Sequence, residues 1–357
     1  MGSFLKDIQP LLKLMQLFGL HFQFSEKLSI KRSFYFLRIY GAICLLLNIS
    51  WHSYSTARFL NWSPRITLST VNNFVDYFNF MLNITGSHVA MYLMTFGGLH
   101  EAHNSIQRLE RVLGTQYNHK LRHSSWMAVA FVVSFVTTQL AVTVYNRERI
   151  KNWDDLLSLL LSDLGHAYPM MSYCLFFVSA LALALHFQHV NSKLACYLER
   201  ESKNSGELDG IRANHGLVCQ AVDQLNGSFQ TLSFIHVVFA FIGIVNTSFM
   251  LMTKSYFSLK IVPYHIESVA RLGLLGYICD RVQSEALACL KTLANTSHVT
   301  GCSLLHQQQH VMFGGQILQT VPKFDVYGLF HLSRQLLPHL VGTTITYSVI
   351  LYQFKAP

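Results

Sequence analysis

The chain has 357 residues, of which 51% are hydrophobic and 13% are charged, with a formal net charge of +9. Soluble domains carry about 25% charged residues, so this composition excludes an ordinary soluble domain and predicts a polytopic membrane protein that resides in a lipid bilayer. The positive charge forms no basic stripe interleaved with exposed aromatic residues. We therefore expect attraction to anionic lipid head groups and no binding to nucleic acid.

Residues 1–33 carry basic residues around one short apolar run, LLKLMQLFGLHF. No small-residue cleavage site precedes the first long apolar stretch, so we expect no cleavable signal peptide. The run is too short to cross a bilayer. It predicts an amphipathic helix that lies on the membrane surface.

Seven apolar stretches are long enough to cross a bilayer. They cover residues 34–56, 68–97, 124–146, 156–188, 232–253, 263–285 and 332–354. The fourth stretch would be about 50 Å long as one helix, against a hydrocarbon core of about 30 Å. We expect it to project beyond the bilayer or to break at Gly165 or Pro169.

The connections between these stretches alternate between short and long. Leu208, Ile211, Leu217, Val222 and Leu225 recur at helical spacing in the long connection after the fourth stretch. We therefore predict helical extensions of the fourth and fifth stretches, and helix again over 289–318 in the connection between the sixth and seventh stretches. The side of the membrane is not decided by charge, because the loops richer in Lys and Arg are also the longer ones.

Motifs for catalysis are missing from the sequence. There is no G-x-S-x-G motif, no P-loop and no Rossmann glycine pattern, so we predict that the chain is not an enzyme and has no cofactor. The seven cysteines form no C-x-x-C pair and the eighteen histidines form no metal-binding spacing. We expect no metal site and read the cysteines as small core residues.

Polar and ionisable residues inside the apolar stretches are the informative ones, because each is costly there unless it is paired or hydrated. They are Asp76, Tyr77, Gln139, Asp163, His166, Asn246, Glu267 and Arg271. Glu267 and Arg271 stand four residues apart, so their side chains can meet on one helix. As a group these residues predict a small-molecule pocket. The alternative is an internal ion pair, with Asp76 hydrated at the interface.

The last stretch carries a stripe of small and polar residues. At about 100° per residue, Gly342, Thr346, Val349 and Gln353 fall on one side of the helix. Such a stripe lines water or packs closely on a neighbouring helix. Because Pro338 can reset the helical phase, we do not extend the stripe to Gln335 and His339.

The same stretch contains Thr346-Tyr347, the five residues SVILY and then Gln353-Phe354. This pattern, TYhhhhhQF with h an apolar residue, resembles the signature of the insect gustatory receptor family. Gly328-Leu329-Phe330 and Gly342 stand where that family has a G-L-F turn and a glycine. Ser348 and Tyr352 are slightly polar for the h positions.

The resemblance implies an all-α fold with seven transmembrane helices in one domain over residues 1–357. The amino terminus, 1–33, would be cytoplasmic, residues 34–285 would hold the first six spans with a ligand pocket in their outer half, and 286–331 would be cytoplasmic anchor helices. Residues 332–354 would line the pore, and the carboxyl terminus would be extracellular.

The resemblance also implies an activity. Members of the family are ligand-gated nonselective cation channels of the plasma membrane, assembled as homo- or heterotetramers and opened by small-molecule tastants. Gln353 and Phe354 would then stand at the outer gate. The identity of the tastant stays open.

Two other classes of protein also consist of membrane-spanning helices. A G-protein-coupled receptor has seven spans, but D-R-Y after the third span and N-P-x-x-Y in the seventh are both missing here. A transporter would show inverted repeats with paired broken helices, and none are visible. We keep both as alternatives to the channel.

Overall fold

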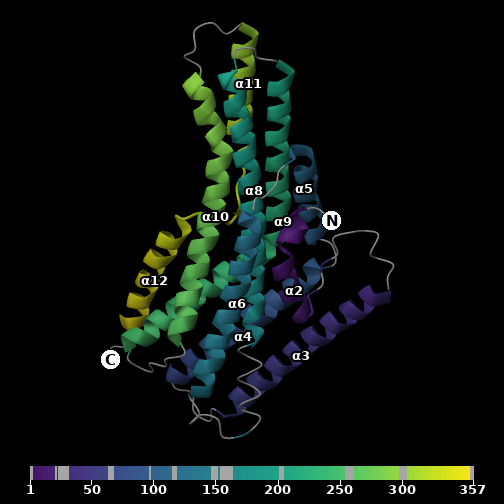
Figure 1. Cartoon of the computed structure of the whole chain (residues 1–357). Helices are drawn as coiled ribbons and strands as arrows, with labels where there is room; N and C mark the ends of the chain where they lie inside the picture. The colour runs from purple at the N-terminus through teal and green to yellow at the C-terminus, as the bar shows by residue number, and fades with distance from the viewer. Residues whose placement is uncertain are drawn as a thin grey trace.

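A computed structural model of the chain describes residues 3–20, 22, 32–62, 68–95, 98–114, 119–145, 152, 164–200, 205–253, 261–296 and 304–353 (Figure 1). The elements are α1 Ser3–Asp7, α2 Gln9–Leu17, α3 Arg32–Trp62, α4 Leu68–Met94, α5 Gly98–Leu113, α6 Lys120–Tyr145, α8 Ala167–Glu199, α9 Ser205–Thr253, α10 Ile261–Thr296, α11 Leu304–Gln319, β1 Asp325–Val326, β2 Phe330–His331 and α12 Leu336–Gln353.

Long helices dominate the described part of the chain. Each of the seven predicted spans overlaps one long helix, namely α3, α4, α6, α8, α9, α10 or α12. Among the described residues, three segments are long and apolar enough to cross a membrane, and they lie in α6 (Lys120–Ala141), α8 (Ala167–Glu199) and α9 (Gly206–Val245). The chain therefore has the all-helical, membrane-type fold that its composition predicts.

Helix α8 is the centre of the molecule, and from Ala167 to Ala184 every residue except Phe177 is buried. Small residues such as Ser179, Ala180 and Ala184 let neighbouring helices approach its axis closely. The helix begins at Ala167, after a turn at His166, so it starts between Gly165 and Pro169 where we expected a break. Pro169 falls in the first turn, the position in which a helix tolerates proline.

Helices α8, α9 and α10 are longer than a helix needs to be to cross a bilayer. With 49 residues, α9 is about 74 Å long, more than twice the hydrocarbon core of a bilayer. The ends of α8 and α10, the start of α9 and α11 form a second bundle at the top of Figure 1. Polar bonds join its helices: Gln188 Nε2 donates to Glu285 Oε1 at 2.5 Å, and His215 Nε2 lies 3.0 Å from Ala286 O.

Helix α11 ends at Gln319, so the range 286–331 that the resemblance assigns to anchor helices ends in a short β-hairpin, at the turn expected from Gly328-Leu329-Phe330. There β1 and β2 pair as an antiparallel hairpin, with Val326 opposite Phe330. Tyr327 and Gly328 both have positive φ, 53° and 70°, which a helix does not allow and a tight hairpin turn requires. Leu329 N donates to Val326 O at 2.9 Å and closes the turn. Gly328 adopts a positive φ easily, which explains why the chain reverses at this turn.

The amino-terminal helices pack on protein, whereas we expected them to lie on the membrane surface. Phe4, Ile8, Leu11 and Met15 have no exposed surface, because α1 packs against α5 and α6 while α2 packs against α6 and α8. The amphipathic pattern was read correctly, but its apolar side covers neighbouring helices. The end of α2 is held in place where Tyr168 Oη donates to Phe18 O at 3.0 Å.

A close glycine contact joins this amino-terminal segment to α3. A Cβ atom at Gly41 would overlap the carbonyl oxygen of Gly19, whose φ is +81°. We expect Gly41→Ala to destabilise the fold by about 1–3 kcal/mol through overpacking, and so to lower the amount of monodisperse protein after detergent extraction. Gly315→Ala is the control, because no atom lies within 4 Å of its new Cβ. Equal yields of the two variants would contradict the tight contact.

Candidate functional site

Helix α12 begins where the hairpin leads the chain back to α10. Arg334 N donates to Asp280 Oδ2 at 3.0 Å, and the Arg334 guanidinium stands over the Tyr277 ring at 4.9 Å. From there α12 runs alongside α9 and α10, as Figure 1 shows at its left side. The start of α12 is therefore anchored to α10 by both backbone and side-chain contacts.

The two sides of α12 differ in exposure. Thr344 and Ser348 are only 3% and 2% exposed, because they face α9 and α10. The predicted stripe lies on the opposite side of the helix, and its members are all exposed: Gly342, Thr346, Val349 and Gln353. A small, polar face thus points away from the chain's own helices.

A groove of about 550 Å³ runs along this exposed side. It is lined by Pro338, His339, Gly342, Thr343, Thr346, Tyr347 and Ile350. The threonine hydroxyls bond back to their own helix, with Thr346 Oγ1 donating to Gly342 O at 3.0 Å and Thr343 Oγ1 to His339 O at 2.8 Å.

Pro338 does not reset the helical phase, as we had allowed for. It stands in the first turn of α12, where proline is tolerated, and His339 N still donates to Gln335 O at 3.3 Å. The face therefore continues to His339, about one turn further than the sequence argument took it. Phe354, the predicted partner of Gln353, lies outside the described residues.

A buried ion pair lies on α10. Arg271 Nε meets Glu267 Oε1, and both side chains are nearly without exposed surface. The guanidinium also stands over the ring of Tyr173 on α8, at 5.2 Å from its centroid. Tyr173 packs against His236 of α9 at 4.2 Å, and His236 Nε2 lies 2.7 Å from Ser172 Oγ. One polar cluster thus joins three helices.

A second cluster lies about two turns away, at the start of α8. The ring of Tyr168 stacks on that of His88 from α4, with centroids 3.6 Å apart and an interplanar angle of 15°. His166 is buried and packs edge-on against Phe135 of α6 at 6.1 Å. Gln139, one turn further along α6, has no exposed surface.

Several buried polar atoms in these clusters have no hydrogen-bond partner among the described residues. They are Gln139 Oε1 and Nε2, Tyr173 Oη and Arg271 Nη1. More than 90% of buried polar groups in folded proteins are hydrogen-bonded to protein or water. These atoms come from α6, α8 and α10, and they can serve as donors and acceptors for a polar molecule held between the helices.

The described part of the chain contains four of the eight predicted pocket residues with their side chains. Gln139, His166, Glu267 and Arg271 are all buried, and the last two meet directly. Asp163 and the side chains of Asp76, Tyr77 and Asn246 lie outside the described residues.

Sequence reasoning missed His88, Tyr173 and His236 in the two clusters. All three lie inside apolar helices, so the rule that selected the predicted pocket residues would also have found them.

Four described cysteines are core residues, namely Cys174, Cys219, Cys279 and Cys289, whereas Cys44 is half-buried and Cys196 is exposed. Burial raises the pKa of the Cys289 thiol to about 12, so it is protonated at neutral pH, and its Sγ–H donates to Asn191 Oδ1 at 2.6 Å. Within the described residues, no three His, Cys, Asp or Glu side chains are grouped as a metal site requires.

Comparison with known proteins gives two kinds of match. A family profile described as 7tm chemosensory receptor matches residues 8–356. The insect olfactory receptor OR5 from Machilis hrabei superposes with a TM-score of 0.73 at 13% sequence identity, over 98% of each chain. Its structure in complex with eugenol gives 0.71 at 13% identity, again over 98% of each chain. A search among curated proteins finds no significant match. At this identity the superposition shows a shared fold.

Proposed function

Because the chain belongs to the 7tm chemosensory receptor family, we propose that it is a gustatory receptor that works as a ligand-gated nonselective cation channel of the plasma membrane. The family profile confirms, at the level of the family, the resemblance drawn from the TYhhhhhQF pattern. The choice of taste over smell rests on that pattern alone, at Thr346, Tyr347, Gln353 and Phe354.

The exposed face of α12 carries the channel proposal. A helix surrounded by lipid gains nothing from glycine and threonine on its outer side, whereas a helix that lines a water-filled path needs small and polar residues there. Gly342, Thr346 and Gln353 turn away from α9 and α10. Four copies of the chain around one axis would bring these faces together around an ion path, with Gln353 and Phe354 at its outer mouth.

The membrane topology is part of the proposal. The seven long helices would cross the bilayer, with the amino terminus and the bundle of α8, α9, α10 and α11 in the cytoplasm and the carboxyl terminus outside. A charged pair as deeply buried as Glu267 and Arg271 then lies in the outer half of the membrane. The tetramer would contain one kind of chain or several related ones.

The ligand site is proposed at the two polar clusters around α8, where buried donors and acceptors converge. A small-molecule tastant would bind Gln139, His166 or the pair Glu267 and Arg271, and would bias the α12 gate through the helices that connect them. The eugenol complex of the Machilis hrabei receptor supports a small organic molecule as the kind of ligand.

Gln139 gives a direct test of this site. Its amide is fully buried with no partner among the described residues, so Gln139→Leu removes only unpaired polar atoms and is expected to leave folding intact. Loss of one hydrogen bond to the ligand should raise the half-maximal agonist concentration about tenfold, with maximal current unchanged. Val133→Leu, on the exposed side of α6, is the matched control. Loss of surface receptor in the Gln139 variant would indicate a structural role.

Whole-cell recording tests the function as a whole. Cells that express the chain, without added G protein, are exposed to a panel of sugars and plant alkaloids. The proposal predicts an inward cation current that persists when the pipette contains GDPβS. A response that GDPβS abolishes would favour the G-protein-coupled alternative.

A further inference from the structure

Helix α6 has an exposed side with two chemically different parts. Its first turn carries Lys120, Arg122 and His123, all exposed. Directly below them stand large apolar side chains with exposed fractions from 42% to 60%, namely Trp126, Met127, Phe131 and Val133. A surface with this order, cationic and then aromatic and aliphatic, matches a lipid with its head group above its acyl chains.

Other basic residues lie on the helices around α6. Lys6 of α1 and Lys13 of α2 are exposed on a helix pair whose buried side packs against α6. Lys193 of α8 reaches the carboxyl end of α5, where its Nζ donates to Leu113 O at 3.4 Å. Arg111 lies in that same last turn of α5. In this turn Phe4 N donates a hydrogen bond to Glu110 Oε2 at 3.2 Å, which partly offsets the negative charge of the carboxylate.

The basic side chains in the first turn of α6 lie at the helix end where positive charge is unfavourable. A helix amino terminus has a positive dipole end that favours acidic side chains, yet the first turn of α6 contains no acidic residue. Basic side chains and the dipole therefore add to one positive field. A polyanion placed there would be attracted by both.

We propose that Lys120 and Arg122, with Lys6, Lys13, Arg111 and Lys193 around them, form a binding site for a membrane lipid with a multiply phosphorylated head group. Four to eight Lys and Arg beside a transmembrane helix are the arrangement that attracts such lipids. The acyl chains would lie along Trp126 and Phe131. In the topology of the proposed function, the site faces the cytoplasmic leaflet.

Purified receptor in nanodiscs tests the site without any reference to channel activity. Discs of phosphatidylcholine with and without phosphatidylinositol 4,5-bisphosphate are compared by the thermal unfolding of the receptor and by titration with a fluorescent form of that lipid. Wild-type receptor should bind the lipid and unfold at a higher temperature in its presence. The double variant Lys120→Gln with Arg122→Gln should bind on the order of tenfold more weakly.

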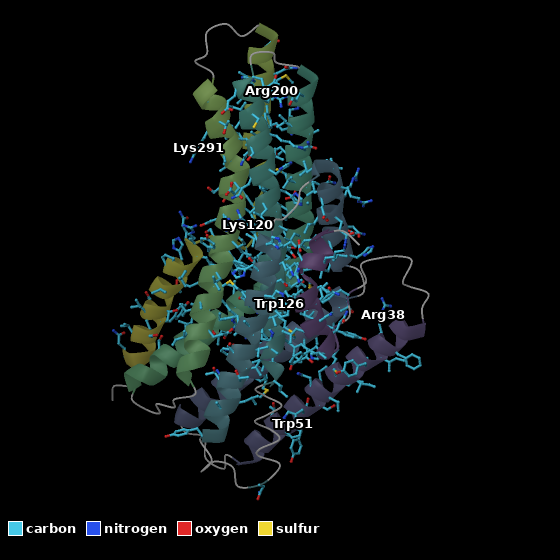
Figure 2. All side chains as sticks on the ribbon, viewed as in Figure 1. Arg38, Trp51, Lys120, Trp126, Arg200 and Lys291 are labelled. Atoms are coloured by element: carbon cyan, nitrogen blue, oxygen red, sulfur yellow. The ribbon has the colours of Figure 1, made fainter. Side chains whose placement is uncertain are left out.

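Lys291→Gln with Arg212→Gln is the matched control, because both residues lie in the second bundle of α8, α9, α10 and α11 and the change in net charge is the same. In Figure 2, Lys120 lies below Lys291 and above Trp126. Equal losses in both double variants would overturn the site in favour of general charge attraction. Equal binding of soluble inositol 1,4,5-trisphosphate would overturn the lipid as occupant. A failed current recording would leave these binding results unaffected, so the two proposals can fail separately.

Discussion

Replacing Glu267 with alanine is expected to remove nearly all receptor from the cell surface. The substitution leaves Arg271 charged and buried beside Tyr173, with no carboxylate to balance it. Breaking a buried ion pair by removing one partner costs about 3–5 kcal/mol, which is a large part of the stability of most folded domains. Surface labelling of an extracellular tag measures the loss, with total protein as the reference.

A double variant distinguishes the pair's charge from its packing. Glu267→Leu with Arg271→Met removes both charges and keeps apolar volume, so surface expression should recover substantially. If the pair also holds the ligand, the recovered receptor will fold but respond to agonist only weakly. Normal surface expression of the Glu267→Ala variant would contradict the structural pair described for α10.

A lysine at position 346 is expected to abolish the cation current. Thr346 stands in the middle of the exposed α12 face and lines its groove. In a tetramer, Thr346→Lys places four positive charges around one narrow path. A ring of lysines opposes cations and favours anions, so agonist-evoked current should fall at least tenfold while surface expression stays within about twofold of wild type.

Thr346→Val controls for the loss of the hydroxyl group, which bonds only to Gly342 O of its own helix. We expect this variant to conduct nearly as wild type does. An unchanged cation current in the lysine variant, with normal surface delivery, would place Thr346 outside the ion path.

Much of the fold could be predicted because membrane helices have a strong signal in composition and length. The stretches at 68–97 and 124–146 correspond closely to α4 and α6. What could not be predicted was set by strand pairing or by tertiary partners. The turn at Gly328 was expected from the resemblance, but the strand pairing of Val326 with Phe330 around it was not. The amphipathic α2 carries no mark that tells a protein surface from a lipid surface.

The candidate site was predicted less completely than the fold. Glu267 and Arg271 were found because an i, i+4 pair is local to one helix, and their contact follows from helical geometry. The stacking of Tyr168 on His88 joins residues eighty positions apart on α8 and α4. Such contacts depend on how the helices pack, which the spacing within one stretch does not contain.

Cysteine accessibility along α12, read as whole-cell current, tests the central claim most directly. Gly342→Cys, Thr346→Cys and Val349→Cys are compared with Val341→Cys and Ile345→Cys, which are also exposed in the single chain but lie about 60–100° off the stripe. A charged methanethiosulfonate reagent should block the agonist-evoked current irreversibly at the three stripe positions and leave the two others and wild type conducting. Block at Ile345 and Val341 with none at the stripe would contradict the pore assignment.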